Sequence, residues 1–221
     1  IGHAVGAELE PCTTYYVSVT IYGENGGEDS AVVRFRTELS AEDWKGYWTF
    51  MPLNSVGGSS LYRKNIVLPD EPVEEAFAYC AGIGCHELFV NGKKADDRLF
   101  SPVNSDYEKR IYYTVYELTG QLVAGENVIG VELAPWWYGS KKLMFQLYVT
   151  LKNGETFELH SSAGDGWWER GGAVKECSVY DGEFCDGRVY DEFIPHWAST
   201  DYRAGIESKW VLPIVSRGDP S

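Results

Sequence analysis

The sequence predicts an all-β protein whose antiparallel strands pack as a jelly-roll β-sandwich. Short runs that alternate apolar and polar residues recur along most of the chain, and turns rich in Gly, Asn and Pro separate them. One such run, Leu88-Phe89-Val90, leads into an Asn91-Gly92 turn, which is typical of a tight hairpin. Helical periodicity is almost absent, so the strands are expected to pack on one another.

The composition is that of a folded globular chain, and it argues against several classes of function. Of 221 residues, 44% are hydrophobic and 24% are charged, which is not the composition of a disordered protein. The net charge of −14 comes without a basic patch, so neither nucleic acid nor an anionic membrane is expected as a partner. Aromatic residues, at 14%, suit strand cores and also a surface that stacks on sugars.

The first forty residues are predicted to hold three strands, of which two can be delimited. Residues 15–22 and 31–37 alternate apolar and polar positions on either side of a glycine-rich turn. Residues 9–17 resemble the tyrosine corner of fibronectin type III domains, which comes late in that fold. Residues 1–39 are therefore predicted to be a partial fibronectin type III-like segment of a fragmentary chain. Its open apolar face requires a partner to cover it.

Residues 40–190 are predicted to form the jelly-roll domain. Residues 39–48 connect it to the first segment, with a one-turn helix starting at Ser40. Further strands are expected at residues 61–68, 75–79, 85–90, 110–116, 127–133, 143–151 and 156–161. Residues 191–221 are expected to be a C-terminal extension that folds back on the sandwich or leads toward a missing domain.

The five cysteines show no metal-binding spacing. There is no Cys-x-x-Cys pair, and the four His residues form no zinc-like cluster with the cysteines. Cys177 and Cys185 flank one turn-like segment, which leaves two alternatives, a disulfide or free, partly buried thiols. Free thiols are favoured, and with them a reducing compartment such as the cytoplasm.

An ordered series of short segments extends over about residues 44–190. It comprises Leu61-Tyr62-Arg63-Lys64, residues 81–92, Ser101-Pro102, residues 106–110, Tyr116-Glu117-Leu118-Thr119, Gly125-Glu126-Asn127, residues 136–139, and Tyr180-Asp181-Gly182-Glu183 with Asp186 and Arg188. In this order the segments resemble the N-terminal jelly-roll region of bacterial α-L-rhamnosidases. The Asn-Gly and Gly-x-Asn segments alone are shared with galactose-binding-like domains. The chain departs from the family at residues 103–105, at Cys185 and at Gly187.

The resemblance implies that this chain is not itself an enzyme. In the family, catalysis takes place in a separate helical (α/α) barrel, so the parent protein is expected to be a glycoside hydrolase. The chain is then a carbohydrate-binding-like accessory module for L-rhamnose or a rhamnosylated glycan. Acidic pairs are plentiful, but with 33 acidic residues chance adjacency explains them. The sequence has no nucleophile elbow, Walker loop or dinucleotide fingerprint.

Two loops are the candidate carbohydrate sites. Family members that bind L-rhamnose do so through a calcium ion in a loop of this domain. The resemblance implies Asp96 and Asp97 as ligands of calcium and sugar, with Asn104 supplementing them. A solvated acidic turn is the competing interpretation, and no cofactor is required under it. The aromatic loop of Trp136, Trp137 and Tyr138 is expected to stack on a pyranose ring or on a neighbouring domain.

A second group of residues is assigned to contact with the absent catalytic domain: Trp167, Trp168, Tyr180, Asp181 and Glu183. Two other functions compete with the carbohydrate-binding module. One is a purely architectural domain that orients and covers the barrel, which predicts an exposed apolar patch. The other is an extracellular adhesion module.

Overall fold

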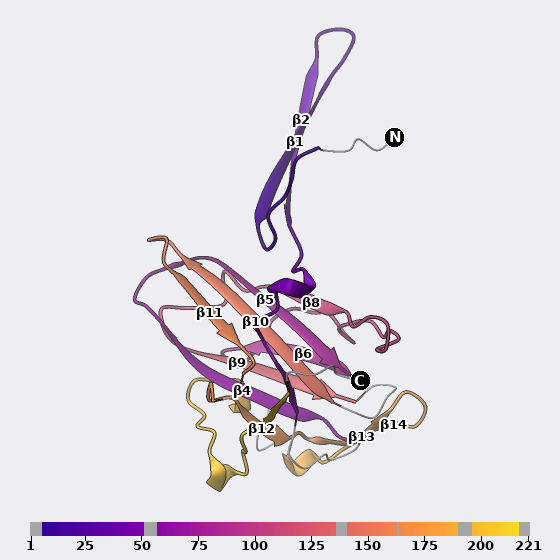
Figure 1. The fold of residues 1–221 in the computed structure, drawn as a ribbon, viewed down its shortest axis with the longest axis vertical. Helices are drawn as coiled ribbons and strands as arrows, with labels where there is room; N and C mark the ends of the chain where they lie inside the picture. The colour runs from indigo at the N-terminus through magenta and orange to yellow at the C-terminus, as the bar shows by residue number, and fades with distance from the viewer. Residues whose placement is uncertain (1–5, 51–56, 136–140, 163, 190–195, 217–221) are drawn as a thin grey trace. The chain divides into compact units, whose positions relative to one another are not determined.

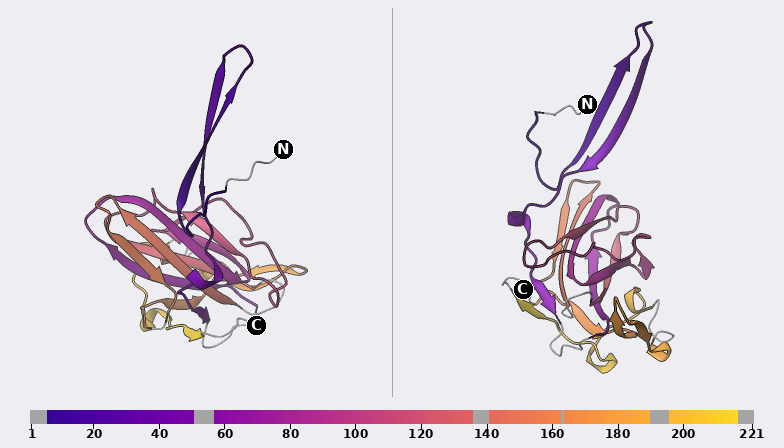
Figure 2. Two further views of the ribbon diagram at one scale, coloured as in Figure 1. Left: turned by 45° about the horizontal axis from the view of Figure 1, so that its top comes forward. Right: turned by 90° about the vertical axis from the view of Figure 1, so that its right-hand side faces the viewer.

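The computed structural model describes residues 6–50, 57–135, 141–162, 164–189 and 196–216. The chain divides into two compact units, residues 1–45 and 46–221. The predicted all-β class is confirmed, because the second unit is a sandwich of two antiparallel sheets (Figures 1 and 2). No helix in the described ranges is long and apolar enough to cross a membrane.

The first unit is a hairpin of β1 (Thr14–Tyr22) and β2 (Glu28–Arg36). The prediction of a third strand is wrong for residues 6–40, because the chain turns at residues 11–12, where Cys12 has a φ of 52°. A contact of the tyrosine-corner type is present, since the Glu10 amide donates to the Tyr15 hydroxyl at 2.9 Å. The predicted one-turn helix is the 3-10 helix η1 (Ala41–Asp43).

One sheet of the sandwich has six strands around a long central pair. In order across the sheet they are β15 (Ile214–Ser216), β3 (Trp48–Phe50), β10 (Lys142–Leu151), β5 (Val73–Ile83) and β8 (Tyr113–Glu117), with β11 (Thr156–His160) paired to β10. Along β10 the odd-numbered residues from Leu143 to Leu151 are buried, which is the alternation of a strand with one face in the core.

The other sheet has five strands. In order they are β12 (Trp168–Gly171), β4 (Ser60–Leu68), β9 (Gly125–Ala134), β6 (Cys85–Val90) and β7 (Lys93–Lys94), and a separate hairpin pairs β13 (Val174–Ser178) with β14 (Gly182–Cys185). The core lies between the two sheets, with Tyr62 and Val131 from this sheet and Phe145 from the other among its buried residues.

Two asparagines join the turns at one end of the five-stranded sheet. The side-chain amide of Asn91 donates from Nδ2 to Asn127 Oδ1 at 2.9 Å. Asn91 Oδ1 accepts a hydrogen bond from the backbone N–H of Val128 at 2.8 Å. Asn127 is fully buried and donates to the carbonyls of Val123 and Gly125. Asn91 and Gly92 have φ values of 51° and 80°, as an Asn-Gly hairpin turn requires. Both side chains thus satisfy backbone groups of two loops.

Substituting Asn127→Ala is expected to lower the free energy of unfolding by about 3 kcal/mol, because several buried backbone groups lose their partner. Urea denaturation measures this change. The control is Asn153→Ala in the turn before β11, where the side chain accepts one hydrogen bond from the exposed Glu155 amide. Equal effects at the two positions would contradict the structural role of Asn127.

Part of the outer face of the five-stranded sheet is covered by residues 196–216, the C-terminal strap, whose last residues form β15 of the other sheet. The strap contains η2 (His196–Ala198) and η3 (Ile206–Ser208), and its Trp197 and Trp210 are buried against β4. Gly130 leaves room for it, since an added Cβ would lie 2.9 Å from the Trp197 ring. Of the two predicted courses of the C-terminal extension, the strap follows the one that folds back on the sandwich.

Candidate functional site

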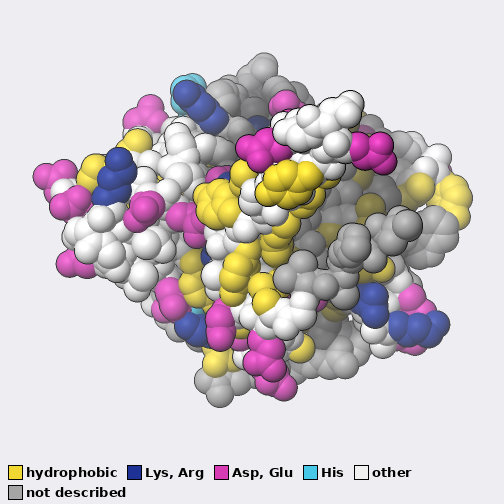
Figure 3. All heavy atoms as spheres, turned by 90° about the horizontal axis from the view of Figure 1, so that it is seen from above, with side chains coloured by type: hydrophobic (Ala, Val, Ile, Leu, Met, Phe, Trp, Pro, Cys, Tyr) yellow, Lys and Arg dark blue, Asp and Glu magenta, His cyan; other side chains and the backbone are white. Residues whose placement is uncertain are grey.

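A groove of about 410 Å³ opens on the outer face of the five-stranded sheet. Strands β6 and β9 form its floor, and the loop at residues 99–100 and the β13–β14 hairpin contribute to its walls. Three carboxylates line it, those of Glu87, Glu132 and Glu183. The groove is therefore acidic, like the protein surface seen in Figure 3, where acidic side chains are more frequent than basic ones.

Strand register brings the first two carboxylates together. Glu87 in β6 lies directly opposite Glu132 in β9, while their neighbours Leu88 and Val131 point into the core. Since successive strand residues face opposite sides, both carboxylates belong to the outer face. Like charges placed opposite each other destabilise a sheet, so this pair has an energetic cost.

Neighbouring groups compensate part of this cost. The Ser59 hydroxyl donates to Glu132 Oε1 at 2.7 Å, and Lys94 forms an ion pair with Glu87 at 2.6 Å. Burial raises the pKa of Glu132, and the charges of Glu87 and Glu183 raise it further. Glu132 therefore holds its proton more strongly than an ordinary carboxyl group does.

The groove also has an apolar wall. It consists of Phe89 from β6 and of Leu99 and Phe100 from the following loop. Phe100 has a φ of 55° and is 64% exposed, which is unusual for a large aromatic residue. A groove lined by both carboxyl groups and an exposed ring suits a ligand with hydroxyl groups on a partly apolar ring.

In the predicted calcium loop, which contains Asp96 and Asp97, the carboxylate of Asp96 binds Arg98. The Asp96 carboxylate accepts hydrogen bonds from the Arg98 amide at 3.0 Å and from Arg98 Nε at 2.5 Å. Arg98 in turn donates to the Val115 carbonyl and lies 4.6 Å from the centre of the Tyr116 ring. Asp97 is exposed beside this pair. Within the described ranges, no three His, Cys, Asp or Glu side chains are grouped so that they could hold a metal ion.

The other predicted carbohydrate ligands lie further along the chain. Asn104 is exposed in the loop that precedes β8. Trp136, Trp137 and Tyr138 lie outside the described residues.

The residues assigned to a domain contact separate into three environments. Trp167 is buried in the core, where its indole donates to the His160 carbonyl, so the assignment of Trp167 to an outside contact is corrected. Trp168 packs with the cluster that includes the C-terminal strap. Tyr180 and Asp181 lie exposed in the β13–β14 turn, and Glu183 lines the groove.

All five cysteines are free thiols, which settles the alternatives left open for Cys177 and Cys185. In the β13–β14 hairpin Cys177 pairs with Glu183, and Cys185 pairs with Val174. Burial raises the pKa of Cys85, at the floor of the groove, to about 11. This thiol is therefore protonated and poorly reactive.

The groove residues Glu87, Phe89, Phe100 and Glu132 were not among those predicted from the sequence. Alternation along β6 and β9 marks the two glutamates as outward-facing positions. The pairing of β6 with β9 joins residues far apart in the sequence, so no local sequence pattern predicts it.

Comparison with known proteins gives a consistent result. A family profile described as the α-L-rhamnosidase N-terminal domain matches residues 71–214. An α-L-rhamnosidase of Formosa agariphila is 28% identical over 246 residues, which cover 93% of this chain and 25% of that protein. An α-L-rhamnosidase of Streptomyces avermitilis is 27% identical over 139 residues, which cover 57% of this chain and 13% of that protein.

Solved structures agree with these sequence matches. The structure of an α-L-rhamnosidase from Dictyoglomus thermophilum has a TM-score of 0.83 at 28% identity and covers 96% of this chain and 26% of its own. An Aspergillus terreus α-L-rhamnosidase has the same TM-score at 20% identity, with the same two coverages, which shows a shared fold. The chain spans about a quarter of the length of the Formosa agariphila relative.

Proposed function

This chain belongs to the α-L-rhamnosidase N-terminal domain family, and from this premise we propose that it is a non-catalytic accessory module of a glycoside hydrolase. The whole protein would hydrolyse terminal α-L-rhamnosides, and this module would bind a sugar of the rhamnosylated glycan. The observation that carries the binding part is the groove, which is lined by three carboxyl groups and by the exposed Phe100 ring. The sequence-based resemblance to the family is confirmed.

The groove residues support binding in a specific way. Sugar hydroxyls would hydrogen-bond to Glu87 and Glu183, while the Phe100 ring would cover an apolar face of the pyranose. Ser59 holds the Glu132 carboxyl group in place from the side of the sheet. Glu87 and Glu132 lie side by side on one sheet face, whereas a hydrolytic pair has to flank the scissile bond.

Isothermal titration with L-rhamnose tests this proposal on the 221-residue chain. We expect weak binding, with a Kd of about 1 mM, that survives chelation of calcium. Substituting Phe100→Ala should weaken binding about tenfold, because the stacking surface is lost. Asp97→Asn is the control, since this carboxylate belongs to the predicted calcium loop and not to the groove. Loss of binding on chelation or in Asp97→Asn would place the sugar in that loop instead.

An architectural role is the second candidate, and a specific observation favours it. Leu99, Phe100, Val103 and Tyr112 are exposed and line one shallow hollow between β7 and β8. Val179 and Phe184 are exposed on the nearby β13–β14 hairpin. Apolar surface of this kind marks contact with another domain. Under this alternative the titration gives no heat with or without calcium.

A further inference from the structure

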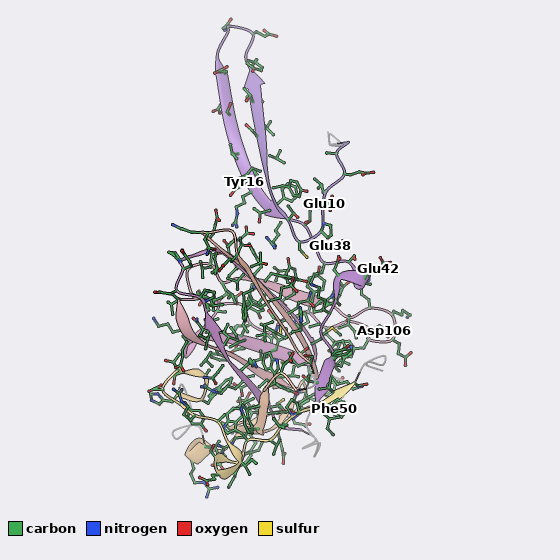
Figure 4. All side chains as sticks on the ribbon, turned by 60° about the vertical axis from the view of Figure 1, so that its left-hand side comes forward. Glu10, Tyr16, Glu38, Glu42, Phe50 and Asp106 are labelled. Atoms are coloured by element: carbon green, nitrogen blue, oxygen red, sulfur yellow. The ribbon has the colours of Figure 1, made fainter. Side chains whose placement is uncertain are left out.

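The groove continues past Phe100 into a second depression. Side chains fill the space between the two sheets (Figure 4), so a ligand of the size of a sugar has to bind at the surface. Beside the groove lies a pocket of about 330 Å³, the side pocket, between the end of β9 and the β13–β14 hairpin. The groove and the side pocket share four lining residues, Cys85, Phe100, Ala134 and Glu183. The two depressions are therefore continuous.

The side pocket combines apolar and polar groups, as the groove does. Its apolar part comes from Pro135 and from Val179, which is 52% exposed. Its polar part includes the Ser178 hydroxyl, which accepts hydrogen bonds from the amides of Tyr180 at 3.1 Å and Asp181 at 3.3 Å. A hydroxyl that accepts from backbone groups keeps its own proton for a further acceptor, such as a sugar oxygen. The side pocket can therefore contact both the apolar and the polar parts of a sugar.

The sizes of the two depressions indicate the length of the ligand. The groove, at about 410 Å³, and the side pocket, at about 330 Å³, both fall within the range of about 300–1,000 Å³ for small-molecule sites. A monosaccharide in the groove would leave the side pocket unfilled. Two linked units fill both, and the second unit binds at the high effective concentration that the linkage creates.

Phe100 lies where the two units would meet. Its ring is 64% exposed, and the residue lines both depressions. Its φ of 55° is an outlier for a bulky residue, and backbone strain of this kind is found where a side chain has to be held in place for a ligand. The exposed ring can thus contact both units of a disaccharide.

The charges around the two depressions select against an acidic sugar. Glu183 lines both of them, and Glu87 and Glu132 line the groove. Among the described residues, neither depression has a lysine or arginine in its wall, and Lys94 is held by its ion pair with Glu87. A sugar carboxylate would meet like charges here and gain no cation in exchange.

We propose that the groove and the side pocket together form a two-unit site for a neutral disaccharide segment of a rhamnosylated glycan. The rhamnose unit occupies the groove, the next sugar unit occupies the side pocket, and the Phe100 ring contacts both. This inference rests on the proposed sugar binding and adds to it the length and the charge of the ligand.

Nuclear magnetic resonance of the isotope-labelled 221-residue chain tests the proposal. The two probes are L-rhamnose and a neutral disaccharide in which L-rhamnose is α-linked to D-glucose. Both should shift the amide signals of Glu87 and Phe89 in the groove, and only the disaccharide should shift those of Ser178 and Val179. The Kd of the disaccharide should be about tenfold lower than that of L-rhamnose. Replacing its glucose unit by glucuronic acid should remove this gain.

Two exposed valines provide a matched pair of variants. Val179 is 52% exposed in the side pocket, and Val123 is 55% exposed and lines neither depression. Val179→Ala should weaken disaccharide binding about threefold, because part of the apolar contact is lost. Val123→Ala should leave it unchanged. Neither variant should alter the binding of L-rhamnose.

The possible failures of the test are distinguishable. If no sugar shifts any amide, the proposed function is wrong and the two-unit site is wrong with it. If both probes shift the same amides with equal Kd, sugar binding stands and the two-unit site alone is overturned. Equal disaccharide affinity in Val179→Ala and Val123→Ala would also overturn it. Equal affinity for the neutral and the acidic disaccharide would overturn the selection by charge.

Discussion

Substituting Arg63→Met is expected to free the C-terminal strap and to lower the free energy of unfolding by about 3 kcal/mol. Arg63 is fully buried on the outer face of β4, where it donates to the carbonyls of Trp197 at 2.5 Å and Tyr202 at 2.7 Å. Methionine keeps the apolar stem but removes the guanidinium donors from both carbonyls. Urea denaturation followed by tryptophan fluorescence measures the loss, since Trp197 and Trp210 are buried under the strap.

The matched control for this variant is Arg203→Met within the strap itself. Arg203 is exposed, pairs with Glu126 at 3.4 Å and donates to the carbonyls of Thr200 and Tyr202 within the strap, so its loss should cost less than about 1 kcal/mol. Hydrogen exchange adds a local readout, because the strap can detach before the sandwich unfolds. If residues 196–216 exchange equally fast in the two variants, Arg63 does not anchor the strap.

Substituting Glu169→Gln is expected to stabilise the protein at pH 8 and to alter how its stability depends on pH. Glu169 lies in β12 and is fully buried beside the Tyr62 and Ser60 hydroxyl groups and the Lys141 ammonium group. Burial raises its pKa to about 8, although the nearby Tyr62 hydroxyl and Lys141 ammonium oppose this shift. The native state therefore keeps a proton that the unfolded chain loses near pH 4.5. Stability must fall as the pH rises from 4.5 to 8, by about 1.4 kcal/mol per unit at the steepest.

The buried side chain of His86 determines the pH range in which the contribution of Glu169 to stability is best measured. Both ring nitrogens of His86 lack partners within the described residues, and burial lowers its pKa to about 3. Stability linked to His86 is complete above pH 6.5 and is lost as the pH falls toward 3, opposite in sign to the Glu169 contribution. Of these two groups, only Glu169 acts between pH 6.5 and 8.

Urea denaturation at several pH values between 6.5 and 8 therefore separates the contribution of Glu169 from that of His86, and the Glu169→Gln variant identifies it. Wild-type stability should decrease by about 2 kcal/mol across this window, and Glu169→Gln should abolish the decrease. Glu155→Gln, in an exposed turn, is the matched control and should behave as wild type. A wild-type stability that is constant from pH 6.5 to 8 would show that Glu169 titrates normally.

Local sequence patterns predicted most strands but not their partners. Alternation located β4, β6, β9 and β10 to within a few residues, because one face of each strand is buried. Asn91 and Asn127 were recognised as turn residues, yet the hydrogen bond between them joins positions 36 residues apart. The groove depends on the same kind of information, since Glu87 and Glu132 face each other only through sheet order.

The adjacent tryptophans show a second limit of sequence reasoning. Because strand residues alternate, Trp167 and Trp168 point to opposite sides, and assigning both to one contact could not hold. Trp167 packs edge-on against Phe145 at 5.5 Å in the core, whereas Trp168 packs with the strap cluster. The five-stranded sheet is covered here on both faces, by the core on one side and by the C-terminal strap on the other. The sequence around Trp167 and Trp168 does not reveal that the strap covers the second face.

Arg63 holds the strap through two main-chain oxygens and through the Tyr202 ring, whose centre lies 5.4 Å from the guanidinium carbon. Residue 202 therefore contributes both its carbonyl and its side chain to the anchor, and the Tyr202 hydroxyl also accepts a hydrogen bond from Trp210 Nε1 at 2.8 Å. An insertion or deletion between residues 197 and 202 would move one oxygen out of reach of the guanidinium. Homologous proteins that keep this arginine are accordingly expected to preserve the number of residues between these two positions and an aromatic residue at the second of them.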